Sequence, residues 1–351
     1  MKTTYKLFFL LLFPYLVLAN GIETGKHNKQ KTISKAYKVN DDAGIDIDNQ
    51  FGPVFVTTWD EDKIQIDVVI KVSGNSEDWV DKRLASIDVD INALTTLVSA
   101  RTKIGNVSGK SSGTSMEIGY TIKIPKRGGV KVSNKYGDVI STDLFGPVKL
   151  NVQYGNLKLA KLNSSSNNFD LQYCGSVNIE KIKIGSIKAD YSKLNIGSFE
   201  NLVIKSDYTD VTAKEGNNVQ YDGNYGKLKF SKVDNLEGKG DYLTVIASDV
   251  DGNISLRGNY STIKVDNIGN PGGNVSVSGN YDTVLVKFAG DFAFDFEVKG
   301  KYTNVGLDGS LQVNTKIENN KERLYKGFHV RSGAKKIAID GEYGNVSLKR
   351  N

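Results

Sequence analysis

The sequence of 351 residues is poor in the residue types that carry most catalytic and metal chemistry. It has one cysteine, Cys174, and two histidines, His27 and His329, which lie far apart. A single cysteine excludes an intramolecular disulfide, and such a residue is usually buried as a small apolar side chain. Two distant histidines argue against a histidine-based triad and against a histidine-rich metal site. We therefore predict no catalytic residue, no metal ligand and no cofactor.

Long apolar segments are missing after the first nineteen residues. Residues 1–19 combine two early lysines with an apolar stretch, Leu7 to Leu18, and with small residues at Val17 and Ala19. This pattern is typical of a secretory signal peptide that is cleaved after Ala19. An uncleaved anchor is the alternative, but about 12 apolar residues are too few to span a bilayer. We expect an exported protein of the periplasm or cell surface, without a transmembrane anchor.

The net charge of the chain is small for its length, and the basic residues are not clustered. The chain has 46 Lys and Arg against 40 Asp and Glu, a net charge of +6, and two of the positive charges lie within residues 1–19. The basic residues are scattered, without the basic stripe and base-stacking aromatics of a nucleic-acid binder. We predict no nucleic-acid partner. Proline is low at 5 and glycine high at 36, which fits a turn-rich all-β protein.

What the sequence does contain is tyrosine at a nearly constant interval. A phrase of Tyr, a turn residue, a polar residue and two aliphatics two apart recurs, for example in residues 260–265. The recurring tyrosines are Tyr136, Tyr154, Tyr173, Tyr191, Tyr208, Tyr225, Tyr242, Tyr260, Tyr281, Tyr302 and Tyr343. Their spacing is 17–21 residues, except for a last interval about twice as long. A fixed period of this size is the mark of a solenoid, whose units bury their apolar faces against their neighbours.

Alternating aliphatic residues indicate β-strands within each repeat. Leu194 and Ile196 form one alternating pair and Leu202 and Ile204 the next, with polar residues between them. A glycine stands two positions before six of the tyrosines, at Gly223, Gly240, Gly258, Gly279, Gly300 and Gly341. A glycine at a fixed place suggests a corner that needs a positive φ. We predict an all-β fold, a parallel β-solenoid (β-helix) with coils of about 18 residues.

The tyrosines then form a ladder with one ring per coil, and two interpretations of it are open. In the first, the rings are a buried stack that fixes the register at a corner, as cross-strand aromatic pairs do in sheets. In the second, they form an exposed ribbon that binds glycans or a flat partner. The bulk of the ring and its constant spacing favour the structural interpretation. The eleven tyrosines are nevertheless the candidate binding residues of the chain.

Composition divides the chain into four parts. Residues 1–19 are the signal peptide and residues 20–33 a disordered basic linker. Residues 34–128 form an N-terminal β region with one short helix near residues 76–86, which Ser76 caps and which covers an open end or edge of the sheet. Residues 129–351 form the tyrosine-repeat solenoid, continuous with the preceding region.

The end of the repeat region is less regular. We interpret residues 310–336 as a coil that lacks its tyrosine and carries a charged excursion from Glu318 to Arg323. The last strand, Val346 to Leu348, precedes Lys349 and Arg350, whose charges would discourage end-to-end stacking.

Three stretches resemble functional motifs without matching them. Residues 104–111 resemble a phosphate-binding loop, but the first glycine stands one place late. Residues 249–253 resemble a calcium loop, yet its twelfth position is Tyr260 rather than an acid. The only break in the repeat gathers charged residues, namely Glu318, Lys321, Glu322, Arg323, His329 and Arg331, which alternate in sign as in a solvated loop.

Three phrases carry a resemblance to a known family: residues 49–56 (NQFGPVFV), 120–125 (YTIKIP) and 130–139 (VKVSNKYGDV). In these the chain resembles the putative-adhesin family of bacterial exported β-solenoid proteins, akin to the domain called head GIN. The resemblance covers most of the chain after the signal peptide and implies an exported solenoid at the cell envelope. Its motifs are structural and transfer no functional residue. The chain departs from the family by placing tyrosine in almost every coil.

Three functions follow as hypotheses. The first is a non-enzymatic, adhesin-like binding or scaffold protein whose partner is a protein or glycan at the cell surface. The second is a carbohydrate-active β-helix enzyme, a lyase or hydrolase, which would need carboxylates gathered on one face. The third is a purely structural protein of the envelope. We favour the first, since fold analogy alone does not justify assigning an enzyme.

Overall fold

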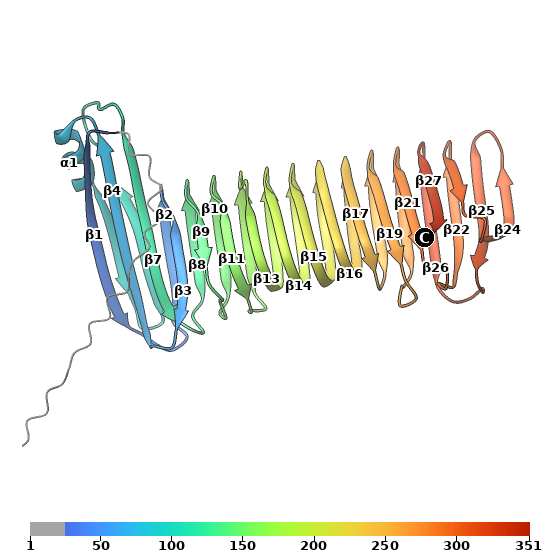
Figure 1. The fold of residues 1–351 in the computed structure, drawn as a ribbon, viewed down its shortest axis with the longest axis horizontal. Coiled ribbons are helices and arrows are strands. Elements are labelled where there is room, and N and C mark those ends of the chain that lie inside the picture. The colour runs from blue at the N-terminus through green and yellow to red at the C-terminus, as the bar shows by residue number, and fades with distance from the viewer. Residues whose placement is uncertain (1–24) are drawn as a thin grey trace, which may run out of the picture.

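In the computed structural model, which describes residues 25–351, the chain forms a long rod of stacked β-coils (Figure 1). The predicted signal peptide, residues 1–19, lies outside the described residues. Strands run across the rod, and successive coils follow one another along it. One helix of nine residues lies at the N-terminal end. No helix within residues 25–351 is long and apolar enough to cross a membrane.

Each coil of the rod has one strand before a corner aromatic residue and one strand after it. The strands before the corner are β2 (Gly44–Gln50), β8 (Val130–Lys135), β10 (Val148–Gln153), β12 (Asn167–Gln172), β18 (Ile254–Asn259), β20 (Val275–Asn280), β22 (Phe294–Lys301) and β26 (Lys336–Glu342). Those after it are β3 (Val54–Trp59), β9 (Val139–Ser141), β11 (Leu157–Leu162), β17 (Leu243–Val250), β19 (Thr262–Ile268), β21 (Thr283–Phe288), β23 (Asn304–Leu307) and β27 (Asn345–Arg350). Four long strands continue from the second face into the first face of the next coil: β13 (Val177–Asp190), β14 (Lys193–Asp207), β15 (Asp210–Asn224) and β16 (Gly226–Asp241).

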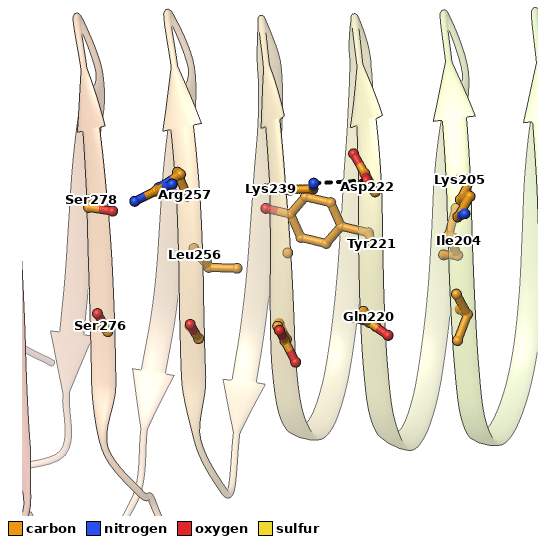
Figure 2. A pocket seen from close by; sticks show the side chains of 14 residues that line it. Ile204, Lys205, Gln220, Tyr221, Asp222, Lys239, Leu256, Arg257, Ser276 and Ser278 are labelled. Carbon is orange, nitrogen blue, oxygen red and sulfur yellow. Dashed lines mark ion pairs between the residues drawn. The ribbon is translucent and has the colours of Figure 1, made fainter.

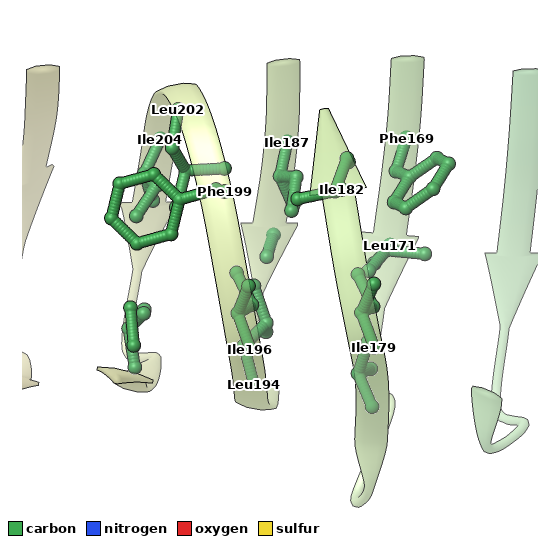
Figure 3. Close-up of a cluster of buried hydrophobic side chains, with 14 of the residues drawn as sticks. Phe169, Leu171, Ile179, Ile182, Ile187, Leu194, Ile196, Phe199, Leu202 and Ile204 are labelled. Carbon is green, nitrogen blue, oxygen red and sulfur yellow. The ribbon is translucent and has the colours of Figure 1, made fainter. Parts of the chain in front are cut away.

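The core lies between the two faces. Equivalent residues of neighbouring coils pair in parallel, so that Leu194 stands between Val177 and Val211. Alternate side chains point inward, and the aliphatic pairs read from the sequence, such as Leu202 and Ile204, are buried (Figure 3). The predicted all-β, mostly parallel solenoid is therefore confirmed. Cys174 is buried, as expected for a lone cysteine.

The N-terminal end replaces parallel coils with longer antiparallel strands. They are β1 (His27–Lys38), β4 (Lys63–Gly74), β5 (Ile87–Ala93), β6 (Leu97–Ile104) and β7 (Ser115–Pro125). On one face β1, β4 and β7 pair antiparallel before β7 joins β3, and on the other β5 joins β6, which pairs with β2. The prediction of a disordered linker was wrong for residues 27–33, because they form part of β1 and pair with β4 along their whole length.

The predicted helix is confirmed as α1 (Glu77–Ala85), with Ser76 as its N-cap. The Ser76 hydroxyl accepts the backbone N–H of Trp79, and Val80 is buried against the strands below. Lys29 of β1 forms ion pairs with Glu77 and Asp81, both at 2.8–2.9 Å. These contacts hold the helix at the N-terminal end of the rod (Figure 1).

At the C-terminal end the chain turns back on itself. After β23 it forms an antiparallel hairpin of β24 (Gln312–Glu318) and β25 (Glu322–His329), and β25 pairs antiparallel with β22. The last coil then inserts between earlier ones: β26 pairs with both β20 and β22, and β27 with both β21 and β23. Two expectations were wrong. Residues 310–336 are a hairpin rather than a coil without tyrosine, and Lys349 and Arg350 do not lie at the end of the rod.

Candidate functional site

The eleven tyrosines occupy the same corner of successive coils, and each adopts a left-handed backbone conformation. Their φ angles are 51–58°, and Phe51 extends the series at the N-terminal end with a φ of 63°. In the interior each tyrosine N–H donates to a carbonyl of the next coil, as from Tyr225 to Asp241 at 3.1 Å. Non-glycine residues rarely adopt this conformation, which costs about 1–3 kcal/mol. The corner is therefore a strained position that the stacking of coils maintains.

The glycines two places before the tyrosines have another role than the one expected. Only Gly240 among the six has a positive φ, of 155°. A Cβ on Gly223 would lie 2.1 Å from the Ser206 carbonyl oxygen, and one on Gly279 only 1.8 Å from that of Gly258. These glycines permit close approach between the backbones of neighbouring coils. The left-handed turn itself belongs to the tyrosine.

The tyrosine rings stack on one another along the rod. Neighbouring ring centroids lie 4.7–5.1 Å apart with interplanar angles of 2–15°. The order in space is Tyr260, Tyr281, Tyr343, Tyr302, because the last coil is intercalated. The predicted ladder with one tyrosine per coil therefore exists. The interval from Tyr302 to Tyr343 is twice as long as the others because the C-terminal hairpin lies between these two residues in the sequence.

The ladder is exposed at the ring edges. Each ladder tyrosine exposes 42–52% of its surface, while its neighbours cover the two ring faces. Tyr302, the last ring, is no more exposed at 44% than Tyr154 inside the stack at 47%. No hydroxyl of the eleven has a hydrogen-bond partner among residues 25–351. The molecule thus presents a row of uncommitted hydroxyl groups rather than open aromatic faces.

Asparagine and aspartate side chains flank the ladder on the side of the preceding strand. The Asp207 carboxylate accepts the N–H and side-chain amide of Asn224, both at 3.1 Å, and Asp241 does the same for Asn259 at 3.1 and 2.8 Å. Between this row and the rings runs a groove of about 390 Å³. It is lined by Asp241, Tyr242, Asn259, Tyr260, Asn280, Tyr281, Glu342 and Tyr343.

The residue after the ladder tyrosine points inward and is buried. Ser192, Thr209 and Ser261 use their hydroxyls to accept an N–H from the adjoining coil at 3.0–3.1 Å and to donate to a carbonyl two residues earlier. Asp282 stands at the same place. One carboxylate oxygen accepts the Ser261 N–H at 2.7 Å, but the other has no partner within the described chain. Burial raises the pKa of Asp282 to about 6, since it disfavours the charged form.

A second hollow, of about 660 Å³, lies on the outer surface of the strands that precede the tyrosines (Figure 2). Small residues such as Ser255, Ser276 and Ser278 line it, together with the Asp222–Lys239 ion pair at 3.2 Å. Beneath it, Gly238 leaves room for the Tyr221 ring, since a Cβ there would lie 2.1 Å from a ring carbon.

The charged break near the C-terminus does not form one reactive site. Glu318 is held by Lys316 at 2.9 Å and Arg323 at 3.3 Å, and the hydrogen bond from Lys316 lowers its pKa. His329 is 3% exposed, and its Nδ1 lies 2.7 Å from the Phe292 carbonyl oxygen. Lys321, Glu322 and Arg331 are exposed. Glu318 and His329 therefore have separate, structural surroundings.

The other motif-like stretches also have structural contacts. In residues 104–111, the Ser111 hydroxyl accepts the N–H groups of Asn75 and Ser76 at the start of the helix. In residues 249–253, Asp249 accepts the Asn267 amide at 3.0 Å and Asp251 pairs with Lys232 at 3.5 Å. Within residues 25–351, no three His, Cys, Asp or Glu side chains gather to hold a metal ion.

Comparison with known proteins gives only weak likeness. No family model matches the chain, and no curated protein matches it. Solved structures similar to parts of its fold include a putative cell adhesion protein from Clostridium sporogenes (12% identity, 92% of this chain and 100% of that one, TM-score 0.19). Two others are putative adhesins, from Bacteroides fragilis (14%, 94% and 100%, TM-score 0.25) and Parabacteroides distasonis (10%, 91% and 97%, TM-score 0.31). At these values no family is assigned, and the head GIN resemblance is not confirmed.

Sequence reasoning located the ladder tyrosines but missed the groove beside them. The acids Asp190, Asp207 and Asp241 each stand directly before a ladder tyrosine and so share one register position. That register was itself the signal, because residues at one position of every coil form a continuous row. Glu342 precedes Tyr343 and so shares this register, but its neighbours in the row could not be predicted from sequence, since its coil is intercalated between those of Tyr281 and Tyr302.

Proposed function

We propose that the chain is an exported, non-enzymatic binding protein, adhesin-like or a scaffold, which engages an extended partner at the cell envelope along its tyrosine ladder. The observation that supports this proposal is the row of half-exposed tyrosines, whose ring centroids lie 4.7–5.1 Å apart and whose hydroxyls have no partner within the described chain. Export rests on the sequence pattern of residues 1–19.

The geometry restricts how a partner is recognised. Since the ring faces are covered, the partner meets ring edges and hydroxyl groups, and a sugar ring cannot stack on an interior tyrosine. Each hydroxyl supplies one hydrogen bond of about 0.5–1.5 kcal/mol, so useful affinity requires several coils at once. A rigid row of donors loses little conformational entropy on binding, which favours a long partner, either a surface protein or a glycan chain.

The direct test removes hydroxyls and keeps the stack. A fluorescently labelled chain beginning at Asn20 is titrated onto washed cell envelopes, and compared with a triple variant Tyr208→Phe, Tyr225→Phe, Tyr242→Phe. Loss of three hydrogen bonds should weaken binding at least about tenfold, with an unchanged melting curve. Lys214→Ala, on the outer surface of the other face, is the matched control. If the triple variant and its Tyr→Ala counterpart both bind as tightly as the parent chain, the ladder has a purely structural role.

The enzymatic alternative has its own assay. The purified chain is incubated with polysaccharides, and released reducing ends are measured over time. We expect none, because Glu318 is paired with cations rather than set against a second carboxylate across a groove. Release that Glu322→Gln abolishes would replace the binding proposal with a hydrolase.

A further inference from the structure

We propose that the groove beside the C-terminal part of the ladder is a binding site for elongated, planar aromatic cations. It runs between the rings of Tyr242, Tyr260, Tyr281 and Tyr343 and the side chains before them, two of which are the carboxylates Asp241 and Glu342. This inference goes beyond the envelope partner and does not depend on it, since a small ligand in this groove needs no second macromolecule.

The shape of the groove suits a long flat ligand. Its tyrosine wall repeats at 5.1, 4.8 and 4.9 Å along the rod, so four rings present their edges in a line. The volume of about 390 Å³ lies at the lower end of the range for small-ligand sites. A rigid planar molecule lying along the rod would contact all four edges and would lose little conformational freedom on binding.

The charge of the groove selects a cation. Asp241 forms no ion pair within the described chain and uses one oxygen to accept from Asn259, so its negative charge is uncompensated. Glu342 is paired with Lys301 at 2.6 Å. The remaining lining residues are neutral amides and phenols. A cation gains from the Asp241 charge, while an anion would be repelled by it.

The N-terminal part of the ladder supplies a contrast within the same molecule. There the residue before Tyr136 is Lys135, whose ammonium group lies 5.0 Å from the Tyr136 ring centroid. The residue before Tyr154 is Gln153. The corresponding place is thus already occupied by a cation of the chain itself. Before Tyr242, Tyr260 and Tyr281 stand Asp241, Asn259 and Asn280, so no cation of the chain precedes these three rings. Lys301, at the same position before Tyr302, is paired with Glu342.

Replacing the two carboxylates of the groove by amides should leave the fold intact. Asn224 and Asn259 stand at the position of Asp241 in the two neighbouring coils, and their side-chain oxygens accept the same kind of hydrogen bond from the next coil. Asp241→Asn therefore preserves the row. Glu342→Gln removes an ion pair with an exposed lysine, which has little effect on stability.

The test uses thioflavin T, a planar benzothiazolium cation, titrated into the purified chain from Asn20 and followed by dye fluorescence on the monomer peak of a sizing column. We expect saturable binding that the double variant Asp241→Asn, Glu342→Gln weakens at least about fivefold and that added salt also weakens. Asp88→Asn, an exposed carboxylate of β5, is the control and should bind as the parent does.

A neutral dye with the same ring system but no charge should bind at least about fivefold more weakly than thioflavin T. Two results would overturn the proposal: no saturable binding by the monomer, or equal affinities for the parent and double-variant chains with both dyes. Neither result bears on envelope binding, which is measured without dye and depends on the tyrosine hydroxyls.

Discussion

The coils in the middle of the rod and those at its C-terminal end pair with their neighbours in different ways. In the middle each new coil pairs in parallel with the one before it, as β14 does with β13 and β15. At the C-terminal end the coil order departs from the chain order, because β26 lies between β20 and β22. The hairpin β24–β25 then covers the coil of β22 and β23, which lies outermost. In this molecule the repeat is therefore extended by simple addition, whereas its C-terminal end is formed by a chain reversal.

The hairpin also shows how the exposed end is protected. The register of β24 with β25 places Glu318 opposite Arg323, and the Lys316 ammonium group lies 5.8 Å from the Tyr325 ring centroid. Charges at this terminal edge discourage another strand from adding to the rod. The middle coils need no such charges, since both of their edges are already paired.

The largest effect should follow from removing the intercalated coil. A chain that stops after Lys335 loses four buried aliphatics, Ile337, Ile339, Val346 and Leu348, and leaves β20 and β22 without their shared neighbour. Truncating one such buried side chain typically lowers the free energy of unfolding by about 2–5 kcal/mol, so we expect the region from β20 to β25 to unfold when all four are lost. Hydrogen exchange would show amide protection lost throughout residues 275–329. Loss confined to the residues nearest the cut would mean that the last coil lies at the end of the rod.

A smaller effect should separate the close backbone contacts of the middle from an open loop at the end. Gly223→Ala, in β15, places a Cβ about 2.1 Å from the Ser206 carbonyl oxygen of the neighbouring coil, so the coils must move apart. We expect a loss of about 1–3 kcal/mol in the free energy of unfolding, as for other overpacked sites. Gly309→Ala is the control, because nothing lies within 4 Å of its Cβ. Equal denaturant midpoints for the two variants would contradict this account.

These two contrasts mark what the sequence could and could not predict. The period of the tyrosines and the alternation around Leu194 and Ile196 predict coils and an inward face, since both depend on local residue patterns. The intercalation of residues 336–350 depends on which edges are free after β23 has formed, and no local pattern records that. The glycines before the tyrosines were assigned to the corner because glycine is the usual left-handed residue. Stacking instead imposes that conformation on tyrosine.

The candidate site divides in the same way. One tyrosine per coil implies a ladder, but exposure of the rings depends on whether the corner points outward, which alternation alone does not decide. Tyrosines treated as buried would each cost about 3–5 kcal/mol when truncated, as large aromatics do in cores. With 42–52% of each ring exposed, a smaller value is expected.

Replacing Asp282 by a neutral residue should change the free energy of unfolding by about 1–2 kcal/mol and make its coil resemble the others. The pKa of about 6 exceeds the unfolded value of about 3.9. The folded chain therefore binds more protons between these values, and its stability falls as the pH rises through about 4 to 6 and remains lower above. Asp282→Thr supplies a neutral hydroxyl like that of Thr209 or Thr303. It should stabilise the chain above pH 6 and remove this slope from urea unfolding measured across pH. A slope that persists in the variant would assign the titration to another group.

The smallest predicted effect tests the ladder corner itself. In a strand, Gly is usually about 0.5–1 kcal/mol less stable than Ala, because it loses more backbone freedom on folding. At Tyr225, where φ is 52°, that order should reverse. Tyr225→Ala loses the stack with Tyr208 and Tyr242 and keeps the strained backbone, so we expect a loss of about 1–2 kcal/mol.

Tyr225→Gly loses the same stack but relieves the strain, so it should be about 1 kcal/mol more stable than Tyr225→Ala. Lys229, an exposed residue in the strand of the same coil, is the matched site, and there the Gly variant should be the less stable of the two. The urea unfolding midpoints of the Ala and Gly variants at both sites test this prediction. If Gly is the less stable residue at both sites, the left-handed corner carries no strain.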